Sequence, residues 1–201
     1  MRFQSLVRQF QETGLLLLSD KALPNVVGLV AGPKVKGSWW GHERGYEIFG
    51  VLKQLEAHPD TLTTRLVSGK VTYLHRRHWP EFLSVATARE IWQTQKLSAS
   101  ARRLLSMVDQ EGEVRTDKIG SFKGLGEAAR EIERRLLVYS EEIHTEKGFH
   151  AKALMAWSRS PKIRDLRLRL GDSRAAKEKL EKLIDGLNSR YNGRGKLPWR
   201  Q

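Results

Sequence analysis

The stretch RLVSGKVTYLHRRHWPEF, residues 65–82, carries the clearest structural signals in the chain. Ser68-Gly69 is typical of a tight turn, because glycine readily adopts the positive φ that such turns need. The alternating run Val71–Leu74 favours a β-strand. The sequence therefore predicts two strands within residues 62–75, joined at Ser68-Gly69, and a helix that begins near Pro80.

Positive and aromatic side chains cluster around the second of these strands. Arginine offers forked donors for phosphate, and histidine adds further donors. In a strand, His75 and Arg77 share one face while Arg76 and His78 share the other, so only one pair is expected to meet a ligand. The alternative is a solvated strand edge that leads into a helix. The cluster consists of Lys70, His75, Arg76, Arg77, His78 and Trp79, and the candidates in it for binding nucleic acid are Lys70, His75, Arg76, Arg77 and Trp79.

Composition favours a polyanionic partner. The 201 residues carry a net charge of +13 and a sequence pI near 10.2, as expected for binding to nucleic acid. The chain has no cysteine, so a disulfide framework and a thiolate zinc site are excluded, and we expect neither a metal nor a cofactor. No apolar run approaches the ~18 residues of a membrane span. We therefore expect a cytoplasmic protein without a membrane partner.

The positive charge is unevenly distributed. Residues 1–100 carry 13 Lys and Arg against 8 Asp and Glu, residues 101–157 carry 10 of each, and residues 158–201 carry 13 against 5. Phosphate contacts are therefore expected from the region of residues 70–77 and from the C-terminal tail. The tail candidates are Arg164, Arg167, Arg169 and Arg174.

The order of expected elements in the second half is helix, short helix, helix, hairpin. Ser98 and Gly112 bound the first helix, a short piece covers residues 114–119, a helix covers 125–137, and the hairpin turns at residues 146–148. That order is typical of a winged helix-turn-helix. We expect an α+β fold with tandem winged-helix-like units, short β-hairpins and a basic C-terminal helix.

Three segments are expected. They are an N-terminal winged-helix-like unit (1–96), a winged helix-turn-helix (97–157) and a basic strand-helix tail (158–201). In the tail, the alternation of Leu and Arg over residues 163–170 predicts a strand. A helix follows over residues 174–191, and the Gly-rich end is expected to fray.

An aromatic and polar stretch precedes the helix predicted over residues 42–58. Trp39 and Trp40 are candidates for stacking on bases, and Arg44 for a phosphate contact. His42 and Glu43 form a pair that could move protons. The alternative is that the two tryptophans fill the base of the core. The same helix is expected to place Tyr46 and Phe49 on its apolar, inward face.

The order of landmarks resembles that of small bacterial winged-helix proteins related to the AlkZ/YcaQ group of DNA glycosylases. The landmarks are Glu12-x-Gly14, Leu23-Pro24, Ala31-Gly32, Trp39-Trp40, Arg65-Leu66-x-x-Gly69-Lys70-x-Thr72-Tyr73, Trp79-Pro80-x-Phe82, Leu97-Ser98-x-x-Ala101-Arg102 and Trp157. The resemblance covers roughly residues 5–157. It implies tandem winged-helix-like units, DNA as the partner and a bacterial protein, whose charge is compatible with association with the nucleoid.

The resemblance also implies a candidate chemistry. Glycosylases of that group carry a Gln-x-Gln or Gln-x-Asp motif that positions the hydrolytic water, and Gln9-Phe10-Gln11 matches it, as does Gln93-Thr94-Gln95. Three interpretations follow. The leading one is binding of nucleic acid, as duplex DNA, without catalysis. The second is a glycosylase for damaged bases that uses Gln9 and Gln11 with His42 or Glu43. The third is a regulatory module that binds an acidic protein.

Overall fold

The structure is a computed structural model that describes residues 3–32, 35, 37–120, 122–144 and 150–200. It is a mixed α+β protein with two three-stranded antiparallel sheets, which confirms the expected α+β class. Internal contacts divide the chain into two compact units: unit 1 is residues 1–82 with 174–201, and unit 2 is residues 83–173. Within the described residues, no helix is both long and apolar enough to cross a membrane.

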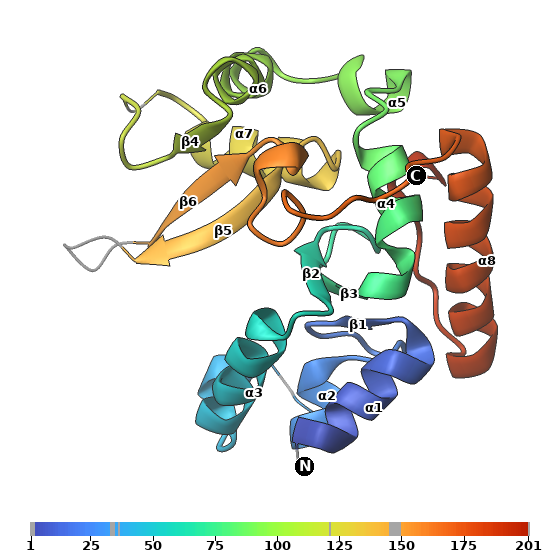
Figure 1. Cartoon of the computed structure of the whole chain (residues 1–201). Coiled ribbons are helices and arrows are strands. Elements are labelled where there is room, and N and C mark those ends of the chain that lie inside the picture. The colour runs from blue at the N-terminus through green and yellow to red at the C-terminus, as the bar shows by residue number, and fades with distance from the viewer. Residues whose placement is uncertain (1–2, 33–34, 36, 121, 145–149, 201) are drawn as a thin grey trace. The chain divides into compact units, whose positions relative to one another are not determined.

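Unit 1 begins with three helices interleaved with the first strand and continues into a hairpin (Figure 1). The strand order is β1-β3-β2, so β3 is the central strand, with Leu74 opposite both Leu15 and Leu62. The elements are α1 (Phe3–Thr13), β1 (Leu15–Leu17), α2 (Val26–Ala31), the 3-10 helix η1 (Trp39–Gly41), α3 (Gly45–Ala57), β2 (Thr61–Thr64) and β3 (Thr72–His75).

The predicted hairpin is confirmed, but its second strand is buried and does not present its side chains to a ligand. Ser68 (φ 52°) and Gly69 (φ 67°) take the left-handed conformation that reverses the chain. Thr72, Tyr73 and Leu74 are each at most 1% exposed, because β3 is covered by strands on both edges and by helices. The hairpin therefore lies within the core of unit 1.

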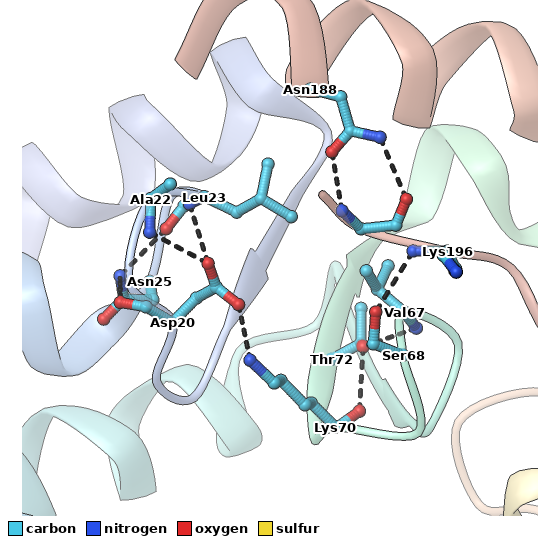
Figure 2. Close-up of polar contacts among 11 residues, drawn as sticks. Asp20, Ala22, Leu23, Asn25, Val67, Ser68, Lys70, Thr72, Asn188 and Lys196 are labelled. Carbon is cyan, nitrogen blue, oxygen red and sulfur yellow. Dashed lines mark hydrogen bonds and ion pairs between the residues drawn. The ribbon is translucent and has the colours of Figure 1, made fainter. Parts of the chain in front are cut away.

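The C-terminal segment belongs to unit 1. Helix α8 (Ser173–Tyr191) buries Leu180, Ile184 and Leu187, and Leu197 is buried just before the 3-10 helix η4 (Pro198–Arg200). Asn188 holds Gly195 through two hydrogen bonds of 2.7 and 2.9 Å (Figure 2). The expectation of a frayed end is wrong, because these contacts fix it.

In unit 2, as in unit 1, a helix, a strand and a further helix precede the hairpin. Its sheet order is β4-β6-β5, and β5 and β6 form the predicted hairpin, whose turn at residues 146–148 lies outside the described residues. The elements are α4 (Trp79–Ala86), which contains the boundary between the units, α5 (Ile91–Thr94), α6 (Ala99–Glu111), β4 (Glu113–Arg115), α7 (Leu125–Arg134), β5 (Tyr139–His144), β6 (His150–Met155) and the 3-10 helix η3 (Trp157–Arg159).

Local signals set the bounds of α6 as expected. The Ser98 hydroxyl accepts from the backbone N–H of Ala101 at 3.1 Å, and Gly112 ends the helix at φ 80°. The strand expected over residues 163–170 is wrong, since these residues form turns and irregular backbone. The short second helix expected within residues 114–119 does not form either, because β4 (Glu113–Arg115) and a turn occupy these residues.

The two units do not coincide with the three expected segments. One boundary lies within α4 and not at residue 96, and the basic tail is divided at residue 173 between unit 2 and unit 1. The basic composition of residues 158–201 suggests one tail segment, but composition does not show which part of the chain a helix packs against.

Candidate nucleic-acid interface

Lys70 is bound within unit 1. Its Nζ lies 2.6 Å from Oδ2 of Asp20, whose Oδ1 accepts from the backbone N–H groups of Ala22 and Leu23 at 2.9 Å each (Figure 2). Burial raises the pKa of Asp20, but the hydrogen bonds and the charge of Lys70 outweigh it and leave that pKa below its usual value. Lys70 thus ties the β2–β3 turn to the loop before α2.

The cluster from His75 to His78 does not continue the strand. A 3-10 helix, η2 (Arg76–His78), follows β3 directly, and His75 Nδ1 accepts from the backbone N–H of Arg77 at 3.3 Å. The expected alternation of faces is therefore wrong. Arg76 lies 3.9 Å from Asp60 and stacks over the ring of Trp79 at 5.9 Å.

Arg77 and His78 cap the end of α1. Arg77 donates through Nε to His78 Nε2 at 3.0 Å and through Nη2 to the carbonyl oxygen of Glu12 at 3.2 Å. The last carbonyls of a helix lack intrahelical partners, so this contact satisfies one of them. Burial, with the charge of Arg77 beside it, lowers the pKa of His78 to about 4, so the ring is neutral and accepts at neutral pH.

This histidine gives a prediction for stability against pH. The folded pKa of about 4 lies below the ordinary 6.5, so the unfolded chain binds the proton first as the pH falls from 7. The free energy of unfolding should therefore decrease between pH 7 and pH 4, by about 2 kcal/mol from His78 after allowing for its partial exposure. His75, whose pKa burial also lowers, acts in the same direction.

Urea unfolding of the wild type and His78→Gln at pH 7 and pH 4.5 measures this contribution. A glutamine oxygen can still accept from Arg77, whereas it does not titrate. The neighbouring charged groups Arg77 and Glu81 and the neighbouring His75 are unchanged in both proteins. We expect the loss of stability on acidification to be smaller in the variant; an identical loss would show that His78 does not carry it.

Trp79 is a core residue and not a stacking surface. It is 1% exposed, and its indole Nε1 donates to the carbonyl oxygen of Leu74 at 3.0 Å. No face of its ring is open to a base, because Arg76 covers it and the core encloses the rest. The expectation that Trp79 binds nucleic acid is therefore wrong, because its side chain is buried.

Trp39 and Trp40 have different roles. Trp39 packs against the core cluster of unit 1, and Trp40 stacks on it with ring centroids 4.3 Å apart at 24°. Trp40 is 59% exposed and also lies 5.3 Å from the ring of Phe49. The two interpretations of this pair therefore divide between its members: Trp39 fills the core and Trp40 presents a surface.

Tyr46 and Phe49 are the residues whose placement the sequence reasoning missed. Both were expected to face inward, yet Tyr46 is 93% exposed and Phe49 37%. The buried stripe of α3 is Ile48, Leu52 and Leu55. Tyr46 is two residues before Ile48, which is about 200° around a helix. The spacing of the buried aliphatic residues therefore places Tyr46 on the opposite, exposed face of α3, and this spacing is readable from the sequence.

The polar residues before α3 serve its first turn. Arg44 donates to Glu47 through two hydrogen bonds of 2.7 Å, and His42 Nδ1 accepts from the backbone N–H of Arg44 at 3.1 Å. Glu43 is exposed. His42 and Glu43 thus lie at a helix start, and their role in proton transfer stays a prediction.

In neither Gln-x-Gln stretch do the two glutamine side chains lie together on one exposed surface. On α1, Gln9 is half-buried and Gln11 is exposed, since residues two apart do not share a helix face. Gln93 is fully buried and donates to the carbonyl oxygens of Ala86 and Arg135, which is a structural role. Glycosylase activity stays a prediction.

The tail arginines are exposed, and they fall in different units. Arg174 of unit 1 lies 3.8 Å from Glu178, and Arg164 of unit 2 lies 3.3 Å from Asp165. Among the residues that the structure describes, no carboxylate pairs with Arg167 or Arg169. Their irregular segment is held by buried Ile163 before it and, after it, by Gly171, whose backbone N–H donates to Ser84 Oγ at 2.9 Å.

Comparison with models of known protein families, with curated proteins and with solved structures found no match to this chain. The resemblance to the AlkZ/YcaQ group therefore rests on the landmark residues alone and stays a prediction.

Proposed function

We propose that this protein binds nucleic acid, with duplex DNA as the ligand, through two winged-helix-like units. The observation that carries the proposal is the recurrence of one sheet order, with a helix before its first strand and a helix directly before its hairpin, although unit 2 has no counterpart of α2 among its described residues. Unit 1 runs α1-β1-α2-α3-β2-β3 with sheet order β1-β3-β2, and unit 2 contains α6-β4-α7-β5-β6 with sheet order β4-β6-β5. In each unit a helix directly precedes the hairpin, as a recognition helix does in a winged helix-turn-helix.

The charge of each unit supports a phosphate ligand. Unit 1 carries 19 Lys and Arg against 10 Asp and Glu, a net of +9, and unit 2 carries 17 against 13, a net of +4. The returning segment of residues 174–201 supplies +5 of the charge of unit 1. A positive field of this kind attracts DNA at long range and is screened by salt.

A cation that already holds a contact within the protein is a weaker candidate for binding phosphate than one that is exposed without such a contact. Lys70 and Arg77 hold contacts within unit 1, as described above, so releasing them to phosphate would cost those contacts. Arg167 and Arg169 are exposed without such a partner among the described residues. Arg134, exposed on α7, joins them as a candidate that the sequence reasoning did not select.

Substituting both Arg167 and Arg169 by alanine should weaken DNA binding and reduce its salt dependence. Each lost phosphate contact lowers the slope of log K against log salt by about 0.9, so the pair lowers it by about 2. Fluorescence anisotropy with a 20-base-pair duplex between 50 and 200 mM salt measures this slope. The matched control removes the same charge from Lys179 and Arg200, which pair with Glu81 and Glu181, and should change the slope less.

The same titration separates the alternatives. Absence of binding to any DNA at 50 mM salt would overturn the proposal and would favour the module that binds an acidic protein. An unchanged slope in the double variant, with binding intact, would place the phosphate contacts elsewhere in the chain.

A further inference from the structure

Three aromatic side chains contact one another beside the start of α3 in unit 1, and a fourth, Tyr46, lies exposed on the same helix. Trp39 lies against the core, Trp40 stacks on Trp39, Phe49 lies 5.3 Å from Trp40, and Tyr46 is almost fully exposed. We call Trp40, Tyr46 and Phe49 the aromatic surface. Single exposed aromatics are ordinary in proteins, but a group of them from neighbouring elements favours a site of contact.

Backbone contacts fix the segment that carries Trp40. The backbone N–H of His42 donates to the carbonyl oxygen of Trp39 at 3.2 Å, and that of Gly45 donates to the carbonyl oxygen of His42 at 2.8 Å. A Cβ atom at Gly45 would lie 3.0 Å from the carbonyl oxygen of Trp40, so glycine permits this close approach. Rings that are ordered before binding lose little conformational freedom when a ligand stacks on them.

The acidic groups of this face are largely neutralised. Glu47 accepts both hydrogen bonds of Arg44, and Glu56 accepts from Lys53 Nζ at 3.4 Å and from the Tyr73 hydroxyl at 3.4 Å. Lys53 Nζ also lies 5.7 Å from the centre of the Phe49 ring. With the net charge of +9 on unit 1, a polyanion with planar groups is electrostatically compatible with the surface, although Glu43 remains exposed beside it.

A helix that reads paired bases in the major groove does so with Arg, Asn or Gln, which match the base edges. The aromatic surface, formed by Trp40 of η1 with Tyr46 and Phe49 of α3, offers ring faces, and ring faces stack on the faces of bases that have left their pairs. We propose, resting on the proposed function, that the aromatic surface stacks on unpaired bases, so that the protein prefers DNA with bulged or single-stranded bases over fully paired DNA.

The experiment compares two DNAs with the full-length protein. One is a 20-base-pair duplex and the other is the same duplex with a three-nucleotide bulge, both at the same salt concentration. We expect the bulged DNA to bind about tenfold more tightly, which is in the range of one stacked base. Binding should also quench tryptophan fluorescence more strongly with the bulged DNA than with the paired duplex.

The variant Trp40→Ala with Tyr46→Ala should bring this preference close to one, because it lowers the affinity for the bulged DNA more than the affinity for the paired duplex. Both residues are exposed, so the melting temperature should change little, and it is measured to check folding. Trp40→Phe keeps a ring face and should keep most of the preference. The variant with Arg167→Ala and Arg169→Ala should lower the affinity for the bulged DNA and for the paired duplex by the same factor.

The outcomes distinguish the two proposals. If no DNA binds, the proposed function fails and this inference fails with it. If both DNAs bind equally and the aromatic variant changes neither, stacking is overturned while the proposed function stands. If the protein sediments as a dimer that the aromatic variant dissociates, with DNA preference unchanged, the surface joins two copies of the chain and stacking is likewise overturned.

Discussion

Deletion of residues 174–201 is expected to unfold unit 1 and not merely to remove positive charge. The segment buries the four aliphatic side chains of Leu180, Ile184, Leu187 and Leu197. Full burial of one such side chain contributes about 1.5–3 kcal/mol. Four of them together are comparable to the whole stability of a typical domain, about 5–15 kcal/mol.

The polar contacts of the segment point the same way. Ser68, in the β2–β3 turn, donates its backbone N–H to the carbonyl oxygen of Lys196 at 2.7 Å and accepts through its hydroxyl from the backbone N–H of Lys196 at 3.1 Å (Figure 2). A Cβ atom at Gly195 would lie 2.8 Å from Leu23 and 2.9 Å from Val67. Backbone and apolar side chains are therefore packed without spare room, and deletion would expose Leu23 and Val67.

Far-UV circular dichroism with thermal unfolding tests this expectation. The chain ending at residue 173 should lose cooperative unfolding of unit 1, and limited proteolysis should degrade residues 1–82. The single substitution Leu197→Ala is the milder companion and should cost about 2–5 kcal/mol. A truncated chain that melts like the full-length protein would show that unit 1 folds without its C-terminal segment. A deletion therefore cannot serve as a test of phosphate contacts, which require point substitutions.

Elements specified by nearby residues could be predicted from the sequence. The turn at Ser68-Gly69, the cap at Ser98 and the helix end at Gly112 each depend on residues within one turn of the chain. These signals act through backbone φ and short-range hydrogen bonds, so no knowledge of the rest of the fold is needed.

Contacts between distant residues could not be predicted in the same way. Lys70 meets Asp20 across 50 positions, and Lys196 meets Ser68 across 128. The run His75–His78 shows the consequence for the candidate site. Its composition is that of a phosphate-binding strand, yet Arg77 bonds to Glu12 and to His78 because the end of α1 lies beside it. A count of cations does not show which carbonyls and carboxylates surround them.

The aromatic surface illustrates a partial success. The sequence makes Trp40 a candidate for stacking on bases, and its side chain is 59% exposed in the structure. Grouping all apolar residues of the helix on one face predicts an inward position for Tyr46, which is 93% exposed in the structure. The helix has more apolar residues than one face can hold, and the aliphatic ones occupy the buried stripe. Exposed aromatics left over from a filled stripe are the more informative residues for function.

Gly14→Ala is the second substitution with a large expected effect. Gly14 ends α1 at φ 77°, donates its backbone N–H to the carbonyl oxygen of Phe10 at 2.9 Å and accepts from the backbone N–H of His75 at 3.0 Å. A Cβ atom there would lie 2.5 Å from His78 Nε2 and 2.8 Å from Arg77 Nη2. Left-handed strain and the clash with the cap of α1 together should cost about 3 kcal/mol in urea unfolding at pH 7.

Two further variants separate the causes of that loss. Gly186→Ala, exposed in α8 with open space around it, is the matched control and should be neutral or stabilise by about 0.5–1 kcal/mol. Adding His78→Ala to Gly14→Ala removes one clashing ring, so the two substitutions should cost less together than the sum of their separate effects. Additive costs would mean that backbone strain alone disfavours alanine at this position, and that the cap formed by Arg77 and His78 does not crowd the end of α1.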